Sequence, residues 1–154
     1  MIWGGLWGAL ALILPLLLHP FGLGQYLMPM FLPLLIAGCT LNLRASLVLA
    51  LTVPPLSSLL TGMPPLYPVS LIMMVEGAMM VSWLFWSRRK KKHNIYFSLI
   101  VAFLLQRLAM LLYLFISPEV LLTALVFSLP GAAAQLIIIP WILKIMTEKG
   151  YLSE

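Results

Sequence analysis

The residues best suited to do chemistry are a glutamate and an arginine that fall inside apolar stretches of the sequence. Glu76 and Arg107 each lie roughly nine residues from the outer end of a predicted membrane helix, which is about 14 Å at the rise of an α-helix. A lone charge at that depth is costly, so the two residues should either pair or face a polar cavity. With Gln135 they would form part of a solute site that opens outward. The other interpretation is a buried ion pair that fixes helix register.

The composition explains why these residues must lie in a membrane. Of 154 residues, 63% are hydrophobic and 8% are charged, whereas charged residues make up roughly a quarter of a soluble domain. Aspartate is absent, and the four acidic residues are all glutamates. So few charges cannot cover a water-facing surface, and the same composition excludes a disordered chain. The length predicts a single transmembrane domain over residues 1–154.

Apolar runs of suitable length predict six transmembrane helices. The first run has no basic segment before it and no cleavage site after it, so we interpret it as a helix and not as a signal peptide. Asn42 and Arg44 interrupt a run that is too long for one crossing, which places a tight turn between the second and third helices. The predicted helices cover residues 2–18, 26–43, 45–60, 67–86, 95–116 and 120–143.

The distribution of charge predicts the orientation of these helices. Five of the nine basic residues form one run, from Arg88 to Lys92, and the positive-inside rule places such a run in a cytoplasmic loop. Because apolar helices and tryptophans flank it, we interpret it as a topological signal and expect no nucleic-acid binding. Both termini then lie inside, and the five tryptophans fall near the inner interface. The predicted fold class is therefore an all-α integral membrane protein, N-in and C-in, in the cell (plasma) membrane.

The two connections predicted to lie outside are unusual for solvated loops. Residues 19–30 and 61–68 carry no charge, taking His19 as neutral, and they are rich in Gly, Pro, Met and Tyr. Glycine and proline fix the backbone, and methionine offers an adaptable apolar surface. We expect two lids over a pocket for a small organic molecule, and the alternative is that both segments lie in the lipid headgroup region. The candidate pocket residues in the lids are Gln25, Tyr26, Met28, Met30, Thr61, Met63 and Tyr67.

Prolines interrupt the second and third predicted helices. Proline removes a backbone donor and kinks a helix, which a membrane tolerates where the freed carbonyls are buried in protein or line a cavity. Broken helices of this kind indicate either a transporter binding site or simple kinking for packing. The prolines are Pro29, Pro33, Pro54 and Pro55.

The first predicted helix has two pairs of small residues spaced four apart. Gly4 with Gly8, and Gly5 with Ala9, would let another helix approach closely. The neighbouring helix belongs either to this chain or to a partner. The sequence contains no phosphate-binding glycine motif. A solute moved uphill would therefore need energy from a partner, and this face is the candidate contact.

The sequence does not predict an enzyme. Cys39 is the sole cysteine and is best explained as a packed residue, because it has no partner for a disulfide or a metal site. No nucleophile–base pair is recognisable, so an integral membrane enzyme is a disfavoured reading. We expect no catalytic residues, no metal and no cofactor.

Several segments together resemble the substrate-binding S components of energy-coupling factor (ECF) transporters, and the similarity covers nearly the whole chain in order. The segment Thr61–Pro65 is its most specific part. One departure is Phe31, where relatives often have a histidine. The matching segments are Gly22–Gln25, Met30–Gly38, Pro54–Pro65, Glu76–Gly77, Gln106–Arg107, Leu129–Gly131, Gln135 and Ile139–Pro140.

The resemblance implies a binding subunit of an ATP-driven importer of bacterial or archaeal type. Such subunits bind a vitamin or related micronutrient from outside, and then associate in the bilayer with a transmembrane coupling subunit and two ATPase subunits. The family contacts its coupling subunit through an Ala-xxx-Ala pair, which the small residues of the first helix match chemically. The opposing hypothesis is a structural membrane scaffold without a ligand.

Overall fold

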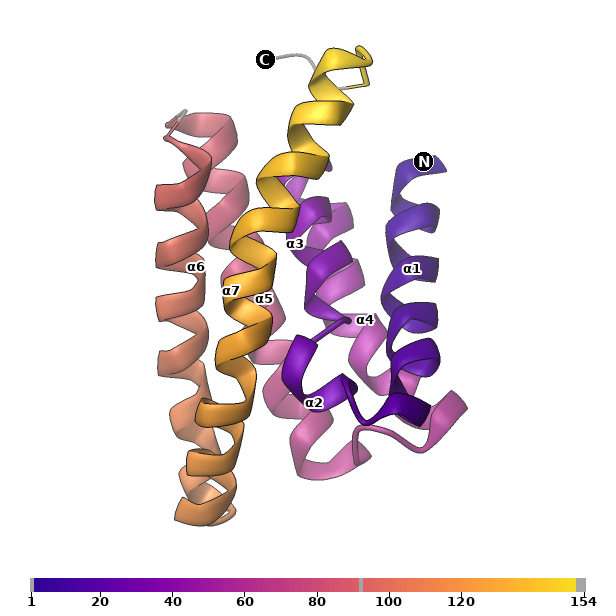
Figure 1. Cartoon of the computed structure of the whole chain (residues 1–154), viewed down its shortest axis with the longest axis vertical. Helices are drawn as coiled ribbons and strands as arrows, with labels where there is room; N and C mark the ends of the chain where they lie inside the picture. The colour runs from indigo at the N-terminus through magenta and orange to yellow at the C-terminus, as the bar shows by residue number, and fades with distance from the viewer. Residues whose placement is uncertain (1, 92, 152–154) are drawn as a thin grey trace.

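The computed structural model describes residues 2–91 and 93–151, and within these ranges it leaves out the side chains of Gln25, Arg89, Lys90 and Phe115. Across the described residues the chain is helical and contains no strand (Figure 1). The elements in chain order are α1 (Ile2–Leu18), η1 (His19–Phe21), α2 (Gly24–Leu27), α3 (Phe31–Thr40), α4 (Leu43–Thr61), η2 (Leu66–Ser70), α5 (Leu71–Phe85), η3 (Trp86–Lys90), α6 (Ile95–Met110), η4 (Leu111–Phe115) and α7 (Pro118–Glu148).

Five helical stretches of the described chain are long and apolar enough to cross a membrane, and α3 is an apolar helix of 10 residues. A crossing needs about 20 residues, so α3 is too short to span the bilayer by itself. The prediction of an all-α, multi-pass membrane protein is confirmed. The long stretches are Ile2–Phe21, Leu43–Thr61, Leu66–Arg88, Ile95–Leu114 and Pro118–Glu148.

The helix predicted over residues 26–43 is wrong in its first part. The chain forms the single turn α2, Met28 then adopts a left-handed conformation with φ 48° and ψ 51°, and α3 begins only at Phe31. Proline disfavours the right-handed helical conformation in the residue before it, and Pro29 follows Met28. The break therefore has a local cause, and it turns this segment into part of the first lid.

Other helix bounds differ less from the prediction. The stretch predicted over 67–86 begins with η2, in which Tyr67 has an extended conformation, and regular helix starts at Leu71. The helix predicted over 95–116 ends at Met110 and continues as the tighter turn η4. The helix predicted over 120–143 is longer, because Ser117 caps it through Val120 N and it runs on to Glu148.

The central helix is α3, which the other helices surround. Seven of its ten residues are buried, and Leu34, Leu35 and Ala37 are fully so. A Cβ at Gly38 would lie 3.1 Å from Val81 Cα, so the glycine permits the close packing of α3 against α5. A short helix can lie at membrane depth when protein surrounds it in this way.

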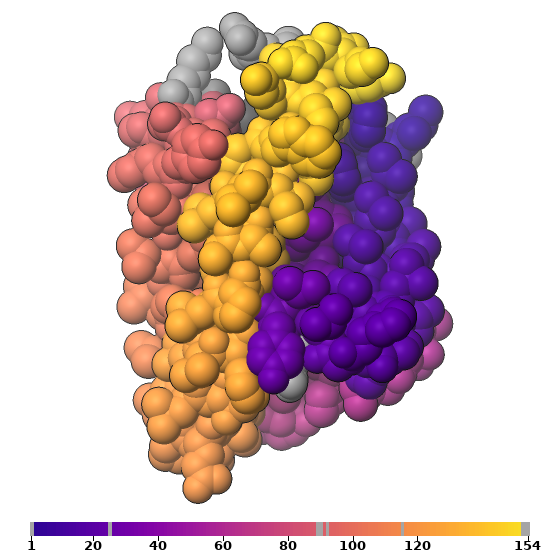
Figure 2. Space-filling model, in the orientation of Figure 1, coloured from indigo at the N-terminus to yellow at the C-terminus, as the bar shows by residue number. Residues whose placement is uncertain are grey.

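The two ends of the bundle differ in what they carry. In Figure 1 both termini and the connection between α5 and α6 lie at one end. The opposite end carries the two lids and the connection between α6 and α7. The first lid is the segment 19–30 and the second is the segment 61–68. Figure 2 shows the first lid on this face, beside α7 and below α1.

Candidate ligand-binding cavity

A cavity of about 840 Å³ lies at the lid end of the bundle. Both lids contribute to its wall, together with residues of α5, of η4 and of the first three turns of α7. Its volume is within the range of roughly 300–1,000 Å³ that small-molecule sites occupy. The polar side chains among its described lining residues are His19, Ser57, Glu76, Tyr113, Glu119, Thr123 and Ser128.

Thioethers and aromatic rings form most of the rest of the wall. Met28, Met30 and Met63, three of the candidate residues of the lids, line the cavity. Two further methionines come from the helices beneath, and their position had a signal in the sequence. Met73 lies one turn before Glu76, and Met110 lies one turn after Arg107, so each shares a helix face with a candidate residue. The five methionines that line the cavity are Met28, Met30, Met63, Met73 and Met110.

Glu76 lies in the cavity wall and is only 1% exposed. Gln106 Nε2 donates to its Oε2 at 3.1 Å, while its Oε1 has no hydrogen-bond partner among the described residues. The neighbouring Gly77 lets α5 pack closely on α4, since a Cβ there would lie 3.3 Å from Ala50 Cβ. Burying a carboxylate oxygen without a donor costs free energy, so a ligand that donates a hydrogen bond to this oxygen would gain binding free energy.

Arg107 lies behind the wall and is not among the described lining residues. Its guanidinium donates to the hydroxyl of Ser128, which does line the cavity, and it lies 3.3 Å from Met110 Sδ. It is close enough to interact with the charge of Glu76, but the two described side chains form no ion pair. Neither interpretation from the sequence describes this arrangement fully, because Glu76 faces the cavity while Arg107 supports it through Ser128.

Gln135 and Gly131 hold the first lid against α7. Gln135 Nε2 donates to the carbonyl oxygens of Leu27 at 3.1 Å and Met28 at 3.2 Å. A Cβ at Gly131, one turn earlier, would lie 2.5 Å from Tyr26 O, so only glycine allows the lid backbone this close. Gln135 therefore acts on the cavity by positioning Met28, and it is not itself a described lining residue.

The second lid is fastened to the end of α4 by hydroxyl groups. Ser57 Oγ donates to Met63 O at 2.9 Å, and Ser58 Oγ donates to Pro64 O at 2.5 Å. Thr61 Oγ1 donates to the same Met63 carbonyl at 3.0 Å and lines a small recess beside the cavity. The two lids meet where His19 Nε2 lies 2.6 Å from Met63 Sδ.

Tyr26 and Tyr67, two more candidate residues of the lids, are not among the described residues that line the cavity. Tyr26 packs edge-on against Phe127, with ring centroids 5.1 Å apart, so it fastens the lid to α7. Tyr67 is 80% exposed. The side chain of Gln25 lies outside the described residues.

The wall formed by α7 was not predicted from the sequence. Five residues of this helix besides Ser128 line the cavity, and they recur at helical spacing along one face. The helical spacing shows that these residues share one face of α7. It does not show that this face meets a cavity, because the helix is apolar on all sides and has few polar residues. These residues are Glu119, Val120, Thr123, Ala124 and Phe127.

The small residues of α1 divide into two sets. A Cβ at Gly8 would lie 3.0 Å from Leu49 Cδ2, and one at Gly4 would lie 3.8 Å from Leu41 Cδ1, so these two glycines pack against the chain's own helices. Gly5 is exposed and a Cβ there would meet nothing within 4 Å, and Ala9 is also exposed. Only the second pair is free to contact another protein.

Comparison with known proteins does not identify a family for this chain. Searches against protein-family models, curated proteins and solved structures find no match. Among the described residues, no three His, Cys, Asp or Glu side chains cluster as a metal site would require. The fold and the cavity define an all-α, multi-pass membrane protein with a lidded cavity at the end opposite its termini.

Proposed function

We propose that this chain is a membrane-embedded binding subunit of the ECF type. It captures a small organic solute, a vitamin or related micronutrient, from the outer side of the plasma membrane. The cavity of about 840 Å³ beneath two fastened lids is the observation that carries the proposal. A protein that only braces other membrane proteins has no need for a cavity of that size. The uncharged lids fit the outer side, because the basic loop lies at the opposite end.

The proposed topology places both termini inside, with α3 completing a set of six helices. It is tested with single cysteines in a Cys39→Ala background, using a thiol reagent that cannot cross the membrane. Phe21→Cys in the first lid should be labelled from outside intact cells, and Tyr151→Cys should be labelled only after lysis, since both native side chains are largely exposed. Labelling of Tyr151→Cys in intact cells would contradict the orientation.

The proposed partners are a transmembrane coupling subunit and two ATPase subunits. The sequence contains no phosphate-binding glycine motif, so the ATP hydrolysis that drives an importer of the ECF type would come from partner subunits. The exposed pair Gly5 and Ala9 on α1 is the proposed contact, because small residues let a partner helix approach closely.

The proposal is tested by native mass spectrometry of the chain purified in mild detergent. We expect a retained small molecule in the wild-type chain. Thr123→Trp, which fills the cavity from α7, should lose it. The matched control is Val126→Trp on the same helix, because Val126 is 59% exposed and is not a described lining residue. A folded wild-type chain that retains no small molecule and binds none from a vitamin panel would favour the scaffold instead.

A further inference from the structure

The residues that line the cavity include two carboxylates and no Lys or Arg among the described side chains. The carboxylates belong to Glu76 and Glu119. The other titratable lining groups are His19 and Tyr113. Arg107 is not among the described lining residues; it donates to Ser128 and Met110, and it is close enough to interact with the charge of Glu76. The cavity therefore offers a negative environment to a solute.

Glu76 is the group that most requires a partner from the solute. It is 1% exposed, it lines the cavity, and its Oε1 receives no hydrogen bond from the described residues. Gln106 supplies a single amide donor to the other oxygen. A buried carboxylate without a cation is costly, and a solute that carries N–H groups and positive charge would remove that cost.

The remaining wall suits the body of such a solute. Phe31, Tyr113 and Phe127 line the cavity together with the five methionines. Aromatic faces attract cations through their quadrupole, and thioethers adapt to apolar shapes without adding charge. An anionic solute would instead meet two carboxylates and no Lys or Arg among the described lining side chains.

We infer that the cavity takes an organic cation: an apolar or aromatic body bearing an ammonium or a protonated nitrogen heterocycle that donates to Glu76. This inference rests on the proposed function, because it assigns a class of solute to that cavity. Glu119, which is exposed at the start of α7, attracts the same solute toward the entrance.

The charge preference of the cavity can be measured without knowing the solute. In a Cys39→Ala background, Met73→Cys places one thiol in the wall, one turn from Glu76. Its reaction rates with a cationic reagent, trimethylammonium-ethyl methanethiosulfonate, and an anionic one, sulfonato-ethyl methanethiosulfonate, are compared. Each rate is divided by the rate for a free small thiol, which cancels intrinsic reactivity. Thr123→Cys places a thiol on the opposite wall and serves if Met73→Cys does not fold.

We expect the cationic reagent to be favoured by at least about tenfold, since a buried carboxylate one turn away acts through a low local dielectric. Adding Glu76→Gln, which keeps the size of the side chain and removes its charge, should reduce the preference to within about threefold. Glu148→Gln is the matched control. It removes an exposed carboxylate at the other end of α7 and should leave the ratio unchanged.

Two labelling results would overturn the inference. One is an equal or anionic preference at the wall cysteine. The other is a cationic preference that persists undiminished in Glu76→Gln. Neither depends on whether a solute is retained during purification, so the proposed function is judged separately. A retained molecule that is an anion would uphold the proposed function and overturn this inference.

Discussion

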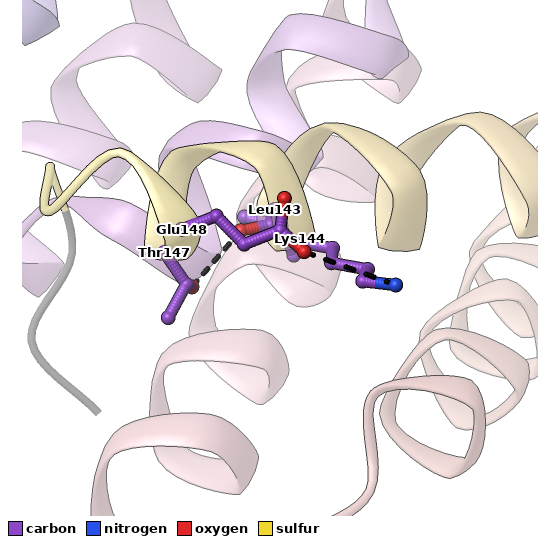
Figure 3. Close-up of polar contacts among 4 residues, drawn as sticks. All are labelled: Leu143, Lys144, Thr147 and Glu148. Carbon is purple, nitrogen blue, oxygen red and sulfur yellow. Dashed lines mark hydrogen bonds and ion pairs between the residues drawn. The ribbon is translucent and has the colours of Figure 1, made fainter.

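The two ends of the bundle hold carboxylates in opposite circumstances. Glu148, near the end of α7, lies 3.8 Å from Lys144 Nζ, and both side chains are largely exposed (Figure 3). Thr147 beside it donates to Leu143 O at 3.0 Å within the same helix. Glu76, toward the lid end, is buried, lines a cavity and has an oxygen without a donor. Water solvates the first carboxylate, whereas the second is buried and lacks a donor that the proposed ligand would supply.

The two ends also differ in what their polar contacts hold. At the end with the termini, Trp83 Nε1 donates to Ser98 O at 2.9 Å and joins α5 to α6, and Trp3 packs against Tyr151. At the lid end, side chains donate to the carbonyls of irregular segments, chiefly Gln135 to the first lid and Ser57 and Ser58 to the second. A few specific polar contacts thus set the shape of the cavity, and single substitutions there should change ligand binding.

The largest effect is expected at Gly131, where the first lid touches α7. Gly131→Ala places a Cβ 2.5 Å from Tyr26 O, so the lid backbone must move away. Overpacking of this kind costs about 1–3 kcal/mol of folding stability. The displaced lid should also open the cavity and abolish retention of the small molecule. Thermal unfolding and native mass spectrometry measure the two effects.

Ala133→Leu is the control for this substitution, because Ala133 is exposed on the same helix and should tolerate a larger side chain. Gln135→Leu is a second route to the same result, since it leaves the Leu27 and Met28 carbonyls without their donor. If Gly131→Ala and Gln135→Leu both bind the small molecule as tightly as the wild type, the lid does not close the cavity.

Substitutions on α1 should have an intermediate effect, which is limited to binding of the partner subunit. Replacing both Gly5 and Ala9 by Leu covers the exposed small-residue face without touching the chain's own packing. Co-purification with a coupling subunit should be lost while the small molecule is retained. Gly8→Leu differs, because an added Cβ there would lie 3.0 Å from Leu49 Cδ2. This substitution should therefore destabilise the chain itself. A complex that survives the double substitution would exclude this face as the contact.

The smallest effect is expected at the exposed ion pair of α7. Lys144→Gln or Glu148→Gln removes a pair whose side chains are 75% and 62% exposed. Exposed pairs at this helical spacing contribute at most about 0.5 kcal/mol. Thermal unfolding should therefore change little, and retention of the small molecule should not change. A large drop in the unfolding temperature, or loss of the small molecule, would contradict the difference between the two ends.

The fold could be predicted where the sequence signal is local. Apolar runs and the basic run gave the helical class and the common end of the termini, and Asn42 marks the α3–α4 turn because it caps α4 through Ala45 N. The break before α3 was missed. Pro29 disfavours regular helix at Met28, but the donor that holds the Met28 carbonyl is Gln135, which lies far away in the sequence.

The site could be predicted only in part, for the same reason. An embedded carboxylate is conspicuous in an apolar sequence, so the sequence singles out Glu76, which lines the cavity, as do the methionines of the lids. The orientation of Arg107 toward Ser128, and the choice of which face of α7 meets the cavity, depend on how three helices pack together. No spacing within one helix contains that information.

An experimental map of the chain, purified in mild detergent and placed in a nanodisc, tests the central claim most directly. The account predicts density for one small molecule beneath the two lids, within hydrogen-bonding distance of Glu76 Oε1. Lids lying apart above a solidly packed interior, with Glu76 satisfied by side chains of its own chain, would contradict it.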